Sequence, residues 1–373
     1  MYGKSFFTIT LLLFTLSLFW SSCYFTRSII YNTPSLDDYK KFPEETIERS
    51  ANPWSFKERP GDVDPGMPVI IQNGNVICSF DRFLEQRQTV AFLLVRNDTI
   101  IYERYFKGYS RTSILPSFSV AKSFISALVD IAIKDGTIKS INQSITDFLP
   151  ELADPGFQGI SLKDLLEMRS GIDFNEDYLN PAGGIAKFYY GRNLRAFCLR
   201  LKISDKAGEV YKYQSANAQL LALAIERATG KSIPVYFDEK IWKPLGAQYD
   251  ATWNLDSPRN KEVKAFCCLN ARAVDFAKFG RLYLNSGLWN GDSVVSSNWV
   301  RESLTIQNDS RDSEHYPYTY SWRVTAGGDF FAKGVGGQYI YVCPHNNTII
   351  VRFGKKYAHI PWPAVFEKLC DAL

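Results

Sequence analysis

The chain has 373 residues, 46% of them hydrophobic, and a formal net charge of +4 from 43 basic and 39 acidic residues. This length can bury a large core and suggests one large or two interleaved domains. Charges of both signs are mixed along the chain without a basic stripe, so nucleic acid is not a favoured partner.

The N-terminus reads as a targeting segment over residues 1–27. Lys4 precedes an apolar run from Phe6 to Trp20, followed by Ser21-Ser22-Cys23, and this order is typical of a secretory signal. Ser-Ser-Cys also resembles a bacterial lipobox in which Cys23 is lipidated, although Trp20 stands where an aliphatic residue is usual. The alternative is an uncleaved membrane anchor. Both interpretations predict an exported chain, held on the outer side of the cytoplasmic membrane or as a periplasmic lipoprotein.

The other cysteines lack the regular spacing of a disulfide framework or a zinc site. Cys267 and Cys268 are adjacent, and we expect them not to pair with each other. We therefore predict buried small hydrophobic side chains and no obligatory disulfide. These cysteines are Cys78, Cys198, Cys267, Cys268, Cys343 and Cys370.

Residues 28–88 are irregular because prolines interrupt any long element. Their aromatic content is too high for disorder, so we predict an ordered lead-in that wraps the body. The pattern then changes to two β-rich runs, Thr89 to Arg96 and Thr99 to Phe106, joined by Asn97-Asp98. That dipeptide between strands indicates a hairpin.

Helical patterns follow the hairpin, and strands return near the C-terminus. The first helix begins near Ser119, with Ser117 as its expected cap, and ends at Gly136. The remaining predicted helices cover residues 161–168, 216–228, 234–241, 273–285, 297–305 and 363–373, and the later strands cover 318–324, 329–332, 338–343 and 348–353. This order favours an α+β fold: an antiparallel sheet built from both ends of the chain, flanked by helices, with an all-helical subdomain at about 137–300 inserted into a domain spanning 89–373.

Ser119 and Lys122 open the first helix three residues apart. Residues at this spacing are neighbours on a helix, so the Lys122 amine is expected within reach of the Ser119 hydroxyl. The helix N-terminus favours a developing negative charge there. These are the parts of a nucleophile activated without histidine, and the alternative is a capping serine beside a surface lysine.

A second proton-handling group must come from elsewhere. The only histidines are His315, His345 and His359, and no Gly-x-Ser-x-Gly or His-Glu-x-x-His motif is present, so a Ser-His-Asp hydrolase and a metal site are disfavoured. Tyrosine is the other candidate base. Tyr213 stands directly before an amphipathic helix, but Tyr178 and Tyr283 fit the same Tyr-x-[Ser/Asn] spacing.

Four motifs, taken in their order along the chain, indicate which tyrosine belongs with Ser119 and Lys122. Ser119-Val-Ala-Lys122, Asp164-Leu-Leu-Glu-Met-Arg-Ser-Gly-Ile172, Tyr213-Gln-Ser215 and Gly334-Val-Gly-Gly-Gln338 together resemble serine β-lactamase-related hydrolases over about residues 80–372. The branch that the chain resembles holds class C β-lactamases, family VIII carboxylesterases and 6-aminohexanoate-oligomer hydrolases.

The resemblance implies that Ser119 is the nucleophile, that Lys122 accepts or shuttles its proton, and that Tyr213 protonates the leaving group. It also implies that Gly334 offers a backbone N–H to the oxyanion hole, while Ser215, Gln338 and Tyr178 border the substrate. Two departures from the β-lactamase pattern stand out. Ser215 replaces an asparagine, and Phe331 stands where a lysine of a Lys-Thr-Gly strand is expected, with Lys333 displaced by two positions.

The sequence therefore predicts an exported serine hydrolase that cleaves a small ester or amide without metal or cofactor. The alternative is a catalytically silent, membrane-tethered protein that binds peptidoglycan fragments or a protein partner. The sequence leaves the acyl group, the leaving group and the oligomeric state open.

Overall fold

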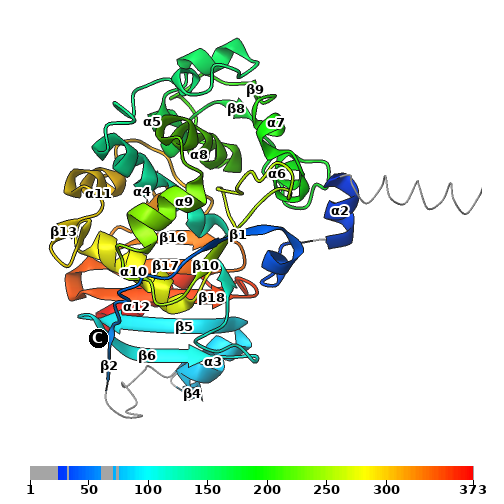
Figure 1. The fold of residues 1–373 in the computed structure, drawn as a ribbon. Helices are drawn as coiled ribbons and strands as arrows, with labels where there is room; N and C mark the ends of the chain where they lie inside the picture. The colour runs from blue at the N-terminus through cyan, green and yellow to red at the C-terminus, as the bar shows by residue number, and fades with distance from the viewer. Residues whose placement is uncertain (1–23, 32, 60–69, 73–74, 373) are drawn as a thin grey trace, which may run out of the picture.

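The computed structural model describes residues 24–31, 33–59, 70–72 and 75–372. Its centre is an eight-stranded sheet in the order β14-β15-β16-β17-β18-β5-β6-β2 (Figure 1). All neighbours pair antiparallel except the short β2, which runs parallel to β6. The strands are β2 (Lys57–Glu58), β5 (Thr89–Arg96), β6 (Thr99–Tyr105), β14 (Tyr318–Thr319), β15 (Trp322–Val324), β16 (Phe330–Gly334), β17 (Gln338–Cys343) and β18 (Thr348–Gly354). The predicted sheet built from both ends of the chain is confirmed, since β18 pairs with β5.

The predicted β5–β6 hairpin turns at Asn97 and Asp98, whose φ angles are 50° and 58°. Asn and Asp tolerate this left-handed conformation, which matches the twist of the strands. The C-terminal run predicted as one strand is two strands instead. Tyr320 and Ser321 also have positive φ, 40° and 70°, and they form the turn between β14 and β15.

Helices cover both faces of the sheet. On one face α10 (Ala273–Leu284) lies against β5, β17 and β18, and α4 (Ala121–Lys134) meets α10 through ring contacts of Phe124. The Phe124 and Phe279 rings stack between the two helices at 3.8 Å. The opposite face is covered by α3 (Phe80–Gln86) and α12 (Trp362–Asp371), which enclose a second, aromatic core with the sheet. The nucleophile candidate Ser119 lies in the turn that directly precedes α4, a helix buried on nearly every side.

A helical region lies at one end of the sheet, in the upper part of Figure 1. It contains α5 (Leu162–Leu166), α6 (Gly184–Tyr190), α7 (Leu194–Cys198), α8 (Ser215–Thr229) and α9 (Ile233–Phe237). Ser161 and Asp164 form the capping box of α5, as that spacing predicts. α8 packs directly on α4, whereas α10, which falls within the predicted helical insert, lies on the sheet.

The parts of the lead-in that the structure describes pack on the body of the protein. β1 (Glu44–Ile47) pairs with β10 (Ala251–Asn254), which continues through β11 (Leu269–Ala271) to β7 (Leu115–Pro116). A helix missed by the sequence analysis, α2 (Tyr24–Tyr31), packs on α6. The predicted targeting segment thus ends within a helix that contacts the body, while the apolar run and Cys23 lie outside the described residues. None of the helices in the described ranges has the length and apolar character needed to cross a bilayer.

The structure corrects the prediction for the cysteines, because Cys267 and Cys268 form a disulfide. Adjacent side chains point to opposite sides of an extended chain. Cys268 is not extended, since its φ of 72° is left-handed, and this turn brings the two sulfurs together. Cys78, Cys198, Cys343 and Cys370 are free thiols.

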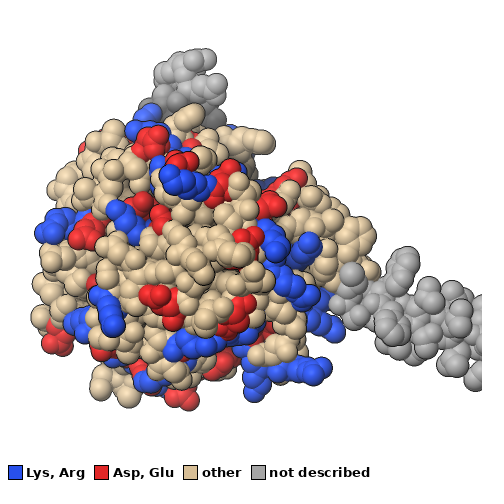
Figure 2. Space-filling model, turned by 90° about the horizontal axis from the view of Figure 1, so that it is seen from above, with Lys and Arg blue, Asp and Glu red and all other residues tan. Residues whose placement is uncertain are grey.

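On the face seen from above, basic and acidic side chains are interspersed (Figure 2).

Candidate active site

Ser119 lies in a tight 3₁₀ turn, Phe118–Val120, between β7 and α4. Phe118 has a φ of 45°, a conformation that is sterically costly for a bulky residue and is often found at functional sites. The predicted cap is wrong: Ser117 is already helical in its backbone and makes no capping bond. Its hydroxyl instead donates to the carbonyl of Phe118 at 3.1 Å.

The Lys122 amine is buried and donates to two oxygens. Nζ lies 3.0 Å from Ser119 Oγ and 2.8 Å from the carbonyl oxygen of Phe266. Burial lowers the pKa of Lys122 to about 7, and the Glu176 carboxylate opposes this shift. An amine with this pKa is substantially neutral near neutral pH and can accept the proton of the adjacent hydroxyl.

Tyr213 stands two residues before the start of α8, beside Ser119 and Lys122. Lys122 Nζ lies 5.1 Å from the centre of the Tyr213 ring. Burial raises the pKa of Tyr213 to about 12, while Arg323 and a hydrogen bond with Ser119 act in the opposite direction. The phenol therefore keeps its proton at neutral pH. Tyr283, which fits the same sequence spacing, packs against Trp322 in the core instead.

Two charged residues at this site were missed by the sequence analysis. Arg323 is buried, pairs with Asp312, and lies with Cζ 5.6 Å from the centre of the Tyr213 ring. Glu176 accepts from the backbone N–H and the hydroxyl of Ser215, both at 2.7 Å. Its carboxylate thus caps the N-terminus of α8 from a distant loop.

Burial raises the pKa of Glu176, and the charge of Lys122 opposes this change. Tyr178, at the mouth of the site, donates its hydroxyl to Glu176 at 3.0 Å. Ser215 lines the cavity, and its hydroxyl donates to Glu176. No local sequence pattern could have revealed the place of Glu176 in the site, because Ser215 and Lys122 lie on other segments of the chain.

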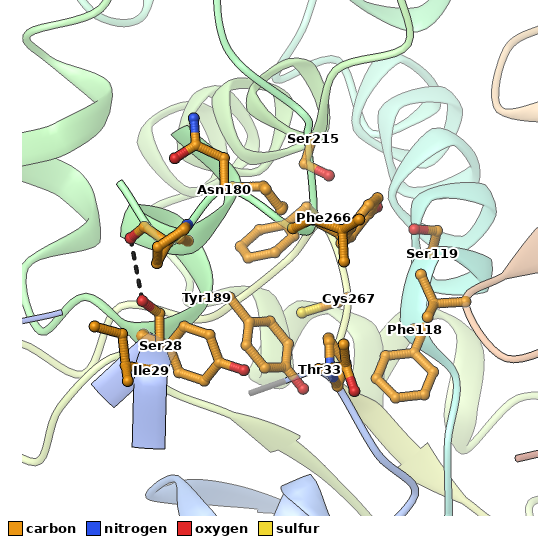
Figure 3. Close-up of a pocket in the computed structure, with 18 residues that line it drawn as sticks. Ser28, Ile29, Thr33, Phe118, Ser119, Asn180, Tyr189, Ser215, Phe266 and Cys267 are labelled. Atoms are coloured by element: carbon orange, nitrogen blue, oxygen red, sulfur yellow. Dashed lines mark hydrogen bonds between the residues drawn. The ribbon is translucent and has the colours of Figure 1, made fainter. Parts of the chain in front are cut away.

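An apolar cavity of about 270 Å³ opens beside Ser119. Figure 3 shows Phe118, Cys267 and Tyr189 around it, with Ile29 of α2 on the far side from Ser119. Tyr178 lines it together with Tyr189 and Tyr190 of α6. The contribution of α2 was not anticipated. Ser28 Oγ fixes this helix by donating to the carbonyl of Pro181 at 3.1 Å.

Gly334, at the end of β16, approaches the nucleophile closely. A Cβ placed on Gly334 would lie 2.5 Å from Ser117 O and 3.2 Å from the Ser119 nitrogen. Gly334 pairs with Gln338 in the β16–β17 ladder, and Val335, the first residue beyond it, lines the cavity. The backbone N–H of Val335 therefore joins that of Gly334 as a candidate oxyanion donor.

Other sequence-based assignments on this hairpin need correction. Gln338 does not face the cavity: its amide donates to the carbonyls of Val335 and Gly354 and accepts from the Gly354 N–H. It is a structural residue of the hairpin. Phe331 packs in the aromatic core behind the sheet, because residues alternate along a strand. Lys333 pairs with Glu314 at 2.6 Å, so neither residue takes the role of the family lysine.

Comparisons with known proteins agree with this fold. The family model described as Beta-lactamase matches residues 79–357. A 6-aminohexanoate-dimer hydrolase of Paenarthrobacter ureafaciens is 27% identical over 364 residues, covering 88% of each chain. A Bacillus anthracis structure assigned as a 6-aminohexanoate-dimer hydrolase superposes with a TM-score of 0.78 at 23% identity, covering 89% of this chain and 90% of the other. A family VIII carboxylesterase superposes at 0.62 and 16% identity, covering 78% and 94%.

Proposed function

The chain belongs to the beta-lactamase family, and from this premise we propose that it hydrolyses a linear ester or amide through an acyl-enzyme on Ser119. One observation carries the proposal. The buried Lys122 amine lies 3.0 Å from Ser119 Oγ and has a pKa of about 7, so a nucleophile and a base are in contact in the protonation states that acyl transfer requires.

The proposed reaction begins when Lys122 Nζ takes the Ser119 proton and Oγ attacks the substrate carbonyl carbon. The carbonyl oxygen becomes an oxyanion, stabilised by the Ser119 N–H and a backbone N–H at Gly334 or Val335. Tyr213 then donates its proton to the leaving oxygen or nitrogen as the scissile bond breaks, and Lys122 returns a proton to the phenol. Water attacks the acyl-enzyme by the reverse proton path and releases the acid.

The cavity supports an uncharged acyl group. Its walls are mainly aromatic and aliphatic, formed by residues such as Phe118, Tyr189, Phe266 and Val335. Neither Phe331 nor Lys333 supplies the cation that the Lys-Thr-Gly strand of β-lactamases provides. The relative that acts on 6-aminohexanoate dimers also supports a linear amide as one substrate class. We propose esters and linear amides ahead of β-lactams.

We also propose export, with the N-terminal segment as signal or anchor, on the basis of the apolar run from Phe6 to Trp20. The variant Cys23→Ser distinguishes a lipid anchor on Cys23 from a transmembrane anchor. Release from the membrane fraction is expected for a lipid anchor, and retention is expected for a transmembrane anchor.

A fluorophosphonate probe followed by peptide mass spectrometry tests the acyl-enzyme directly. We expect the label on Ser119 and its loss in Ser119→Ala. Ser123→Ala is the matched control, since this hydroxyl lies one helical turn further on and donates to the carbonyl of Ser321. Labelling that persists in folded Ser119→Ala would refute the assignment of the nucleophile.

A further inference from the structure

Four side chains of metal-binding type converge on the side of the sheet that faces α12. Asp329 directly precedes β16, Cys343 ends β17, His345 lies in the short turn between β17 and β18, and Cys370 is in the last turn of α12. The cluster is separate from the Ser119 site, whose helix α4 is on the other face. Neither its residues nor its chemistry enters the hydrolytic mechanism.

The spacing of the ligand atoms fits one small cation. An oxygen of Asp329 and the sulfurs of Cys343 and Cys370 all lie within 4.8 Å of one another. His345 Nδ1 lies 3.1 Å from Cys343 Sγ and 3.6 Å from Asp329 Oδ1. A tetrahedral ion with bonds of about 2.0–2.3 Å holds its ligand atoms roughly 3.3–3.8 Å apart, so only small side-chain shifts are needed.

A second observation points to a missing partner at this position. Asp329 is 2% exposed, and its Oδ1 is buried without a hydrogen bond. Its Oδ2 is already satisfied by the Tyr341 hydroxyl at 2.5 Å. A buried carboxylate oxygen without a donor is unfavourable, and a bound cation would satisfy it.

We propose that Asp329, Cys343, His345 and Cys370 bind one Zn²⁺. Two thiolates with an imidazole and a carboxylate are a donor set suited to zinc, and four protein ligands make a closed site of the structural kind. Asp371 Oδ1 lies 3.8 Å from His345 Nε2, where a carboxylate can orient a metal-bound imidazole.

The site would fasten the last helix to the sheet. Asp329, Cys343 and His345 come from the strand ends and Cys370 from α12, whose Trp362 and Phe366 fill the second core. Asn346 already reaches the same end of α12 by donating to the carbonyl of Cys370. Half of the His345 side chain is exposed, which leaves the ion a path to solvent.

The test uses the full chain without an affinity tag, loaded with ZnCl₂, gel-filtered and assayed for metal. We expect one zinc per chain. We expect at least about tenfold weaker binding in His345→Ala, and loss of the metal in Cys343→Ser. Cys198→Ser is the matched control, because this thiol is also buried and free but lies in the helical region. With Co²⁺ in place of zinc, thiolate charge-transfer absorption should appear and should vanish in Cys370→Ser.

Removal of the metal by a chelator should lower the thermal midpoint of the wild type and leave that of Cys343→Ser, which is expected to hold no metal, unchanged. Ester hydrolysis by Ser119 should survive chelation, which separates this proposal from the proposed function. Three results would overturn it: no retained zinc in the wild type, equal zinc in wild type and Cys343→Ser, or a Cys343–Cys370 disulfide in the isolated protein.

Discussion

Replacing Gly334 with alanine should damage catalysis far more than folding. The added Cβ would lie 2.5 Å from the carbonyl oxygen of Ser117 and 3.2 Å from the backbone nitrogen of Ser119. Ordinary contacts begin near 3.4 Å, so relief requires β16 and the Ser119 turn to separate by about 0.9 Å (3.4 minus 2.5). Both contacts are with backbone, which cannot rotate away as a flexible side chain could.

The size of the effect follows from this displacement. A misplacement of about 1 Å costs about a hundredfold in rate, so kcat/KM for p-nitrophenyl acetate should fall by about that factor. Overpacking typically costs about 1–3 kcal/mol, and each kcal/mol lowers the thermal midpoint by about 2–4 °C in a domain of about 150–250 residues and by less in a larger one. The variant should therefore stay folded at assay temperature.

Gly327→Ala is the matched control for this prediction. A Cβ at Gly327 would meet only the carboxylate oxygen of Glu367, at 3.4 Å, and the side-chain oxygen of Thr325, at 3.8 Å. Its activity and thermal midpoint should equal those of the wild type. A folded Gly334→Ala enzyme that hydrolyses the ester at the wild-type rate would refute the close approach of β16 to the nucleophile.

The remaining predictions concern the acid–base groups and the substrate. Because Lys122 must be neutral to act as a base, kcat/KM should rise with pH through an apparent pKa of about 7, and a profile without an inflection there would contradict its role. The same depressed pKa means that the folded state binds fewer protons than the unfolded state, so this group should make the free energy of unfolding rise between pH 7 and the ordinary lysine pKa of 10.5. Tyr213→Phe should lower kcat/KM about a hundredfold or more, whereas Tyr178→Phe should cost less, since its hydroxyl contacts Glu176; the opposite ranking would reassign the acid. Chromogenic cephalosporins should be poorer substrates than short p-nitrophenyl esters, and a higher kcat/KM for a cephalosporin would overturn the proposed substrate class.

Local patterns predicted most of the fold and the centre of the site. Ser119 and Lys122 share a helical turn, and Asn97-Asp98 lies between two β-rich runs. Sequence spacing alone therefore predicts the contact between Ser119 and Lys122 and the position of the hairpin turn. Tyr213 was selected by its place among ordered motifs, and the structure brings it beside Ser119. These relations depend on neighbours in the chain or on motif order.

The features that were missed depend on contacts between distant segments. Glu176 reaches Ser215 from another loop, and Arg323 arrives from a strand of the C-terminal third. Phe331 was expected at the position of the Lys-Thr-Gly lysine. Its position in the sequence does not show which face of the strand its side chain takes. The pairing of Cys267 with Cys268 depends on one left-handed backbone angle, which no propensity of cysteine predicts.

Because α2 lines the cavity, the N-terminal part of the described chain contributes to the selectivity of the enzyme for acyl groups. Ile29 lines the cavity from α2 (Tyr24–Tyr31), and this helix overlaps the end of the segment predicted to direct export, residues 1–27. If processing left the mature chain to begin beyond Tyr31, α2 would be lost and the cavity would be open to solvent on that side. Such a shortened enzyme would keep Ser119, Lys122 and Tyr213 yet accept bulkier acyl groups, so the cut site of the leader would set the substrate range.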